Sequence, residues 1–182
     1  MPKIIPNLEK NILEAAWGLF LQEGYEQASI RKLASILNIA PGTIYNYFST
    51  KDEIYFRIFA DSWQKTKQSV TEIIKKPLPE YEKDEMLIRK VYGDVKQRRE
   101  ALYAAFSSEW KIKRFGETWR EYFRESPAEV LAEMFSGSPE GLRSGTVFLH
   151  GIRGVLAQFP GKDERNITYL TELYRLMKRG SR

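Results

Sequence analysis

The sequence predicts an all-α protein with two domains, and three observations lead to this fold class. Apolar residues recur at three- and four-residue steps along most of the 182-residue chain, which is the period of amphipathic helices. No stretch alternates apolar and polar residues as a half-buried strand would. Pro77 and Pro79 mark the clearest break in the helical pattern. We therefore expect an N-terminal domain over residues 1–50, a connecting helix over about 50–76 and a second helical domain over 77–182.

The first two helices are predicted from their caps and their apolar spacing. Asn7 is a suitable N-cap, and apolar residues follow at helical spacing as far as Gly24, which is a natural C-terminal stop. Ser29 then caps a short second helix, whose apolar side leaves Arg31 and Lys32 on the opposite face.

A third short helix and a long fourth helix follow. Pro41 suits the first position of a helix because its missing N–H would have no helical partner there, so the stretch 41–48 is predicted to be helical. Thr50 and Glu53 have the spacing of a capping box. They are expected to open the fourth helix, which ends before Pro77.

Beyond Pro79 the sequence predicts only further helices. The stretch from Ser126 to Glu129 combines a cap, a proline at the first helical position and a reciprocal glutamate, so a helix is expected to begin there. The other segments with helical periodicity are 87–95, 102–110, the surroundings of Trp119, 138–159 and 163–177.

The second and third helices have the pattern of a helix-turn-helix, in which the second helix of the pair enters the major groove of DNA. Pro41 and Gly42 would let the backbone approach the bases closely. Ile44 and Phe48, four residues apart, would anchor the helix to its own domain. The outward residues, which offer hydrogen bonds and apolar contacts to DNA, would be Thr43, Tyr45, Asn46 and Tyr47. The alternative for the two tyrosines is packing in a core.

These residues resemble the TetR family of bacterial transcriptional regulators. The matching stretches fall in order over roughly residues 8–60; they are Gly24-Tyr25, Ser29 to Ala34, Gly42 to Tyr45, Tyr47-Phe48 and Lys51 to Ile54. The resemblance implies a DNA-binding domain of three helices, a long connecting fourth helix, and a C-terminal domain that binds a small molecule and dimerises.

The resemblance also implies the residues that contact DNA. The expected contacts are Arg31, Pro41, Gly42, Thr43, Tyr45, Asn46, Tyr47 and Lys51. Arg31 would reach a base edge or a phosphate, and Asn46 could read an adenine. Lys51 would hold a phosphate from the start of the fourth helix. The alternative for Arg31 and Lys32 is a solvated helix face.

Aromatic residues are concentrated in the middle of the second domain, where they would either fill a core or line a pocket for an apolar ligand. Glu109, His150 and Arg153 could supply polar groups to such a pocket. The candidate pocket residues are Tyr103, Phe106, Glu109, Trp110, Trp119, Phe123, His150 and Arg153. For the lone histidine His150, a structural role is the alternative.

Glycines are frequent in the segment 138–159, although each costs a helix interior about 1 kcal/mol. Their concentration favours close packing of another backbone against this segment. The resemblance implies a two-fold dimer interface that this segment forms together with the last helix. The expected dimer-interface residues are Gly145, Gly151, Gly154, Leu170, Tyr174 and Met177.

Composition restricts the function classes. The net charge is +5, and residues 27–51 contain no acidic residue, so an anion such as DNA would meet only positive charge there. The absence of cysteine excludes disulfides and thiolate chemistry. With one histidine and no metal-ligand spacing, we expect no metal, no cofactor and no enzyme. No apolar run approaches a membrane span and nothing suggests export, so a cytoplasmic, nucleoid-associated protein is expected.

The sequence therefore predicts a homodimeric regulator, most simply a repressor that leaves a palindromic double-stranded DNA operator when a small, largely apolar effector binds the second domain. Two alternatives stay open. One is a helical protein-interaction module without DNA binding, and the other is a small enzyme that uses the aromatic-lined domain.

Overall fold

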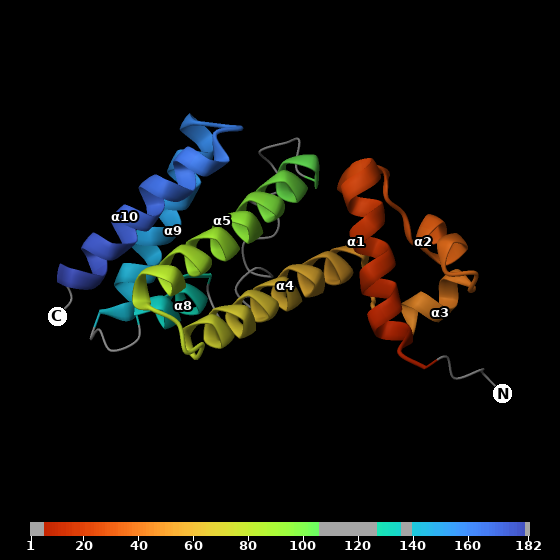
Figure 1. The fold of residues 1–182 in the computed structure, drawn as a ribbon. Coiled ribbons are helices and arrows are strands. Elements are labelled where there is room, and N and C mark those ends of the chain that lie inside the picture. Colours follow the sequence, from red (N-terminus) through yellow and green to blue (C-terminus); the bar gives the residue numbers. More distant parts are fainter. Residues whose placement is uncertain (1–5, 106–126, 136–139, 181–182) are drawn as a thin grey trace. The chain divides into compact units, whose positions relative to one another are not determined.

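The computed structural model of the protein describes residues 6–105, 127–135 and 140–180, and every regular element within these ranges is a helix (Figure 1). No strand occurs in them, which confirms the predicted all-α class. None of the helices in these ranges is long and apolar enough to cross a membrane.

The chain divides into two compact units, and the division falls inside a helix. Unit 1 contains the described residues 6–61 and 99–105, and unit 2 contains residues 62–98 together with the described residues from 127 onward. The helix shared by both is α4, Lys51–Ile74. The sequence had suggested that the second domain begins after this helix, whereas by contacts α4 contributes to both units.

Unit 1 begins with α1 (Leu8–Gln27), α2 (Ile30–Ile36) and α3 (Pro41–Tyr45). Asn7 precedes α1 as predicted, but its backbone is left-handed, with φ 57°, and its side chain makes no capping bond. Gly24 interrupts α1 with φ 77°, a conformation that glycine adopts without strain. Ser29 caps α2 as expected, because its Oγ accepts a hydrogen bond from the Lys32 backbone N–H at 3.2 Å.

The predicted capping box at the start of α4 forms with one shift. Thr50 Oγ1 accepts a hydrogen bond from the Glu53 backbone N–H at 3.0 Å. The Glu53 carboxylate reaches back to the N–H of Ser49, at 2.7 Å, rather than to that of Thr50. The first bond satisfies a donor that a helix N-terminus would leave unpaired, and the second ties the segment before the cap to the first turn. Together they fix the point at which α4 begins.

The core of unit 1 is largely aromatic where α1 meets α4. The Tyr55 ring lies in contact with Phe20, Tyr25 and Phe59, with ring centroids 5.4, 5.2 and 4.8 Å away. Ile12 and Ile54 are also fully buried. Apolar burial of this kind is what holds the short helices α2 and α3 in place, since helices of their length are not stable alone.

Unit 2 consists of the second part of α4 and the helices α5 (Glu80–Ala105), α8 (Pro127–Ala132), η1 (Glu133–Phe135), α9 (Gly141–Gln158) and α10 (Asp163–Gly180). The predicted helices at 87–95 and 102–105 belong to the single helix α5. The rest of the predicted helix at 102–110, and the one around Trp119, lie outside the described residues. Figure 1 shows α9 and α10 running side by side.

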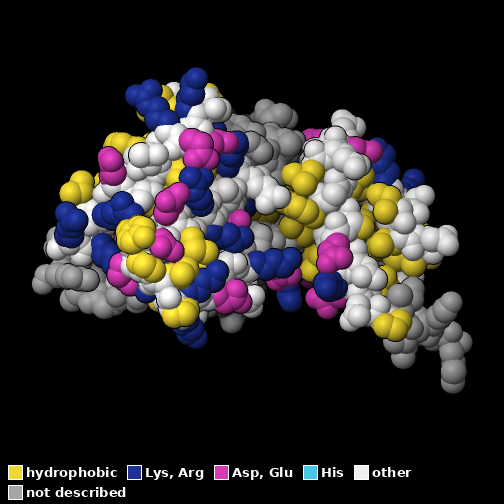
Figure 2. Space-filling model, viewed as in Figure 1, with side chains coloured by type: hydrophobic (Ala, Val, Ile, Leu, Met, Phe, Trp, Pro, Cys, Tyr) yellow, Lys and Arg dark blue, Asp and Glu magenta, His cyan; other side chains and the backbone are white. Residues whose placement is uncertain are grey.

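Unit 2 combines an apolar core with ion pairs between α5 and α10. The core includes Val91, Phe148 and Leu170, each fully buried. Across the surface, Arg89 pairs with Glu164 at 2.8 Å. Figure 2 shows basic and acidic side chains interspersed over this unit. Exposed ion pairs contribute little individually, so the apolar core supplies most of the stability of unit 2.

Candidate nucleic-acid interface

A tight turn joins α2 to α3. Asn38 adopts a left-handed conformation with φ 53°, which asparagine tolerates better than most residues. The backbone N–H of Ile39 returns to the carbonyl of Ala34 at 3.0 Å. This connection of a few residues sets the direction of α3 relative to α2, as a helix-turn-helix requires.

The residues of α3 and the turn after it separate into an inward and an outward set. Ile44 is fully buried and Phe48 is 4% exposed, so both anchor the segment to unit 1. Tyr45 is 54% exposed and Tyr47 is 42% exposed. The predicted orientation of these four side chains is therefore confirmed, and packing of the two tyrosines in a core is excluded.

The other predicted DNA contacts near α3 also lie at the surface. Pro41, Gly42 and Asn46 are exposed, and Thr43 is half-buried. Among the residues that the structure describes, no atom lies within 4 Å of the position that a Cβ on Gly42 would occupy, apart from its neighbours in the chain and the backbone of its own helix. The N-terminal end of α3 is thus open to a close approach by a large partner.

Arg31 and Lys32, adjacent in sequence, have different surroundings. Arg31 is exposed and forms no ion pair with any residue that the structure describes. The ammonium of Lys32 lies 2.7 Å from the Glu23 carboxylate, so its charge is already partly balanced within unit 1. Of the two, Arg31 is the side chain with its charge available to a base edge or a phosphate.

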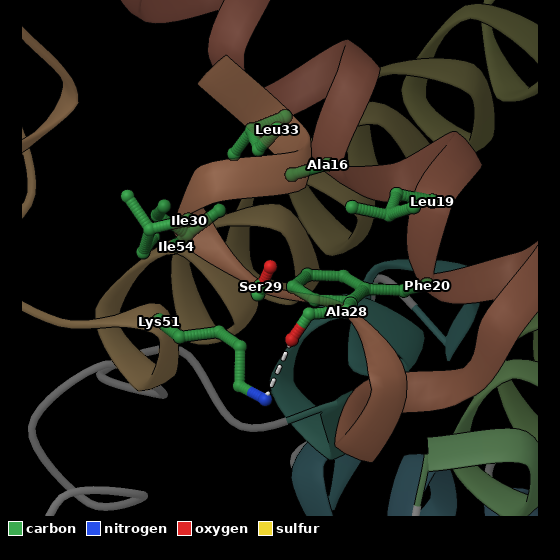
Figure 3. Close-up of a pocket in the computed structure, with 9 residues that line it drawn as sticks. All are labelled: Ala16, Leu19, Phe20, Ala28, Ser29, Ile30, Leu33, Lys51 and Ile54. Carbon is green, nitrogen blue, oxygen red and sulfur yellow. Dashed lines mark hydrogen bonds between the residues drawn. The ribbon is translucent and has the colours of Figure 1, made fainter. Parts of the chain in front are cut away.

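Lys51 is held more tightly by its own unit than the sequence suggested. Its Nζ donates a hydrogen bond to the carbonyl oxygen of Tyr25 at 2.6 Å. It donates a second to the carbonyl oxygen of Ala28 at 2.9 Å, which Figure 3 shows as a dashed line. It also lies 4.1 Å from the centre of the Tyr25 ring. Burial lowers the pKa of the Lys51 ammonium. Two of its three N–H groups are occupied, which leaves one for a phosphate.

The hollow beside Lys51 is too small to be an effector site. Its volume is about 180 Å³, part of which is open solvent, whereas ligand pockets measure roughly 300–1,000 Å³. Figure 3 shows apolar side chains of α1, α2 and α4 around it, with Lys51 at its edge. The hollow is a packing gap under α2.

The predicted effector pocket stays a prediction. Phe106, Glu109, Trp110, Trp119 and Phe123 lie outside the described residues, and of Tyr103 only its place in α5 is described. His150 and Arg153 are exposed residues of α9. Within the described parts of the chain, no group of three or more histidine, aspartate or glutamate side chains could hold a metal ion.

Two of the residues expected at a dimer interface belong instead to the core of their own chain. Leu170 is fully buried and Tyr174 is 1% exposed, so neither side chain can reach a partner. Gly145 is also buried, and Met177 packs against the same core. The expectation was wrong for Leu170 and Tyr174 because helical spacing identifies an apolar stripe without showing what covers it.

The glycines of α9 have separate explanations. A Cβ on Gly151 would lie 3.3 Å from Leu173 Cδ2, so this glycine allows α10 of the same chain to approach closely. Gly154 is exposed, and no described atom beyond its chain neighbours and its own helix backbone lies within 4 Å of a Cβ built there. Gly154 therefore remains available to a partner.

A second apolar stripe on α10, which the sequence prediction missed, does face outward. Tyr169 is 56% exposed and Leu176 is 65% exposed, with the half-buried Leu173 between them. On α9, Val147 is 53% exposed. The steps of four and three residues from Tyr169 to Leu176 were a helical signal that could have identified this face. We call Val147, Gly154, Tyr169, Leu173 and Leu176 the outer face of α9 and α10.

Comparison with known proteins identifies the type of N-terminal domain. Residues 12–58 match the family described as bacterial regulatory proteins, tetR family. The uncharacterized HTH-type transcriptional regulator YhgD of Bacillus subtilis is 25% identical over 139 residues, which cover 76% of this chain and 71% of that protein. The fatty acid metabolism regulator protein of B. subtilis is 32% identical over 82 residues, and these span 45% of this chain and 42% of the relative.

Solved structures of low sequence identity share the fold. The fatty acid degradation regulator FadR from Bacillus halodurans has a TM-score of 0.62 at 18% identity, with 99% of this chain and 98% of that chain covered. FadR from B. subtilis, solved in complex with stearoyl-CoA, has a TM-score of 0.60 at 17% identity, with 94% and 98% covered. The likeness extends over both units and not only over the N-terminal helices.

Proposed function

We propose that the chain is a transcriptional repressor of the TetR type, because its residues 12–58 match that family. Its homodimer would leave a near-palindromic DNA operator when a small effector binds. Members of this family are regulators, which points away from an enzyme. Neither an interaction module without DNA binding nor a catalyst is favoured by a specific feature of the described residues.

The observation that carries this proposal is the division of side chains around α3. Ile44 and Phe48 are buried while Tyr45 and Tyr47 are exposed, so two aromatic side chains of this segment are open to a partner. Arg31 stands exposed on α2. An aromatic and cationic surface on a helix-turn-helix fits the edges of bases and the phosphates that flank them.

A homodimer would place two such surfaces on one DNA molecule. Recognition helices related by a two-fold axis contact successive major grooves when they are about 34–36 Å apart. The outer face of α9 and α10 supports this assembly, because its exposed Tyr169 and Leu176 lie on the same side of α10 and would gain from burial by a second copy.

The effector is proposed to have a large apolar part. Two of the similar proteins are named for fatty acid metabolism or degradation, and one similar structure contains stearoyl-CoA. The aromatic-rich sequence between Tyr103 and Phe123 suits such a molecule. Effector binding would act on DNA affinity through α4, since this helix contributes to both units. A coupling of about 1–3 kcal/mol would suffice.

Selection of DNA fragments bound by the full-length chain from its source genome tests this proposal. We expect enrichment of a near-palindromic site, including one upstream of the protein's own gene. Addition of long-chain acyl-CoA then tests the effector proposal separately, because release of the selected fragment is the expected result. Failure to enrich any fragment over random DNA would reject the repressor proposal.

A further inference from the structure

Arg98 of α5 is a buried cation held by neutral groups. Arg98 is only 6% exposed. Nε donates a hydrogen bond to Ser62 Oγ at 2.8 Å, and Nη2 donates to the carbonyl oxygen of Ser62 and to Thr66 Oγ1, both at 2.5 Å. The guanidinium carbon lies 3.9 Å from the centre of the Trp63 ring. All of these partners are on α4, so α4 fixes one side of the guanidinium.

The other terminal nitrogen of Arg98, Nη1, has no such partner. It is buried and donates to no atom of the described residues. A buried charged donor without an acceptor is strongly destabilising, and such groups are rare in folded proteins unless a ligand, an ion or water satisfies them. Nη1 therefore lacks a hydrogen-bond acceptor that a group from outside the described residues would supply.

The charges around Arg98 do not balance. Asp94 accepts a hydrogen bond from Thr66 Oγ1 at 2.6 Å, and Thr66 in turn accepts from Arg98. The same Asp94 carboxylate also accepts from Lys90 Nζ at 3.0 Å. Among the described residues, Lys90 pairs with this carboxylate directly and Arg98 through Thr66, so these three charged groups carry an excess of one positive charge. An anion at Nη1 would neutralise it.

The guanidinium keeps its charge at neutral pH in spite of its burial. Burial lowers the pKa of Arg98 to about 10, and the charge of Asp94 opposes part of this change. At pH 7 the guanidinium is therefore still protonated, and Nη1 carries two N–H groups that can donate hydrogen bonds. Hydrogen bonds from a charged donor to an oxyanion are roughly twice as strong as those between neutral groups.

We propose that Nη1 of Arg98 binds the oxyanion, a carboxylate or a phosphate group, of an otherwise apolar small molecule. The inference rests on the proposed function only in identifying this molecule as the effector. Because Ser62 and Thr66 accept hydrogen bonds from the same guanidinium, an anion that draws Arg98 toward itself would weaken its bonds to α4. The site thus provides both a requirement for negative charge and a contact with the helix shared by the two units.

Three probes with the same apolar chain separate the sources of affinity. Decanoate, decyl phosphate and 1-decanol are titrated into the full-length chain by calorimetry. We expect at least one of the two anions to bind about ten-fold or more tightly than 1-decanol, as one charge-assisted hydrogen bond implies. Which anion binds more tightly distinguishes a carboxylate from a phosphate ligand. Arg98→Met should remove the advantage of the anion.

Lys65→Met is the matched control, because it removes one positive charge from an exposed position on α4 next to Thr66. This variant should retain the wild-type preference for the anion. Equal binding of the anion by wild type and Arg98→Met, or no anion binding by wild type at all, would overturn the proposal.

Asp94→Asn tests the same site in the opposite direction and does not depend on the folding of Arg98→Met. Removal of the shared carboxylate increases the excess positive charge, so the anion should bind several-fold more tightly while 1-decanol is unaffected. Weaker or unchanged anion binding by Asp94→Asn would contradict the charge argument. All of these measurements are made without DNA, so their outcome does not depend on whether the protein binds an operator.

Discussion

Lys51 and Ala28, 23 residues apart in sequence, are joined by a hydrogen bond of 2.9 Å from the lysine ammonium to the alanine carbonyl. Lys51 is the first residue of α4, and Ala28 follows α1 immediately before the cap of α2. The bond therefore ties the start of the shared helix to the connection between α1 and α2. A movement of α4 would strain this tie, so under the proposed function effector binding would reach the helix-turn-helix through it.

Replacement of Lys51 by Met should destabilise unit 1. The change leaves two backbone carbonyls without their charged donor, at a cost of about 1–3 kcal/mol. Hydrogen exchange of the amides of α1 and α2 measures this loss within unit 1. Lys10→Met is the control, because Lys10 has a 73% exposed side chain in a 3.7 Å surface pair with Glu14. If Lys51→Met keeps full stability and instead lowers the salt slope of DNA binding by about 1, Lys51 serves mainly as a phosphate contact.

The neighbours Ile44 and Tyr45 should respond oppositely to substitution by alanine. Ile44 is fully buried, so Ile44→Ala should lower the free energy of unfolding by about 2–5 kcal/mol. Tyr45 is 54% exposed, so Tyr45→Ala should change stability by less than about 0.5 kcal/mol but weaken DNA binding. Urea unfolding and DNA titration of both variants provide the comparison. Loss of stability in Tyr45→Ala as large as in Ile44→Ala would show that this side chain packs inward.

Asp163 should contribute to the stability of unit 2 at neutral pH and lose that contribution in acid. Hydrogen bonds from Lys96 at 2.6 Å and from Tyr92 at 2.8 Å lower the pKa of the Asp163 carboxyl in the folded chain. Because the folded-state pKa is below the unfolded value, the unfolded chain takes up the proton first as the pH falls below about 4. Stability is therefore lost progressively from there down through the folded-state pKa.

Asp163→Asn isolates this effect. Its thermal midpoint should fall less than that of wild type between about pH 6 and about pH 3, the range that spans ordinary carboxyl pKa values. Glu172→Gln, at an exposed position of the same helix, should follow the wild-type profile. Identical acid profiles for wild type and Asp163→Asn would show that these two hydrogen bonds do not contribute to pH-dependent stability.

A charge on the outer face of α9 and α10 should prevent dimerisation. Leu176→Glu places a carboxylate at a 65% exposed apolar position, where burial by a second copy would have to desolvate it. We expect wild type to be dimeric and Leu176→Glu monomeric by light scattering, with little change in folding. Tyr81→Glu, at a 62% exposed position on α5, is the control and should stay dimeric. A dimer in Leu176→Glu would place the interface elsewhere.

The fold was largely predictable because local signals determine its helices. The cap at Ser29, the capping box of Thr50 and Glu53, and the break in α1 at Gly24 all lie in short sequence windows. The outward orientation of Tyr45 and Tyr47 was predictable too, since Ile44 and Phe48 already supply the apolar face that a short helix buries.

Long-range partners could not be predicted in the same way. The capture of Lys51 by two carbonyls joins residues 26 and 23 positions apart. The burial of Leu170 depends on other helices. Because α10 carries two apolar stripes, the sequence alone does not show which of them is buried in the core. No local signal distinguishes Arg98 from other helical cations, because its partners Ser62 and Thr66 lie 36 and 32 residues away in sequence. Periodicity gives the faces of a helix, but tertiary packing decides which face is covered.

The most direct test of the central claim compares two dissociation constants of the full-length chain at physiological salt. One is for a fragment selected from the source genome, and the other is for random DNA of the same length. We predict a selected fragment that binds at least ~10³-fold more tightly. Arg31→Ala should weaken this binding by about 1–3 kcal/mol, whereas Lys10→Ala should not change it. Equal affinity for selected and random DNA would contradict the account.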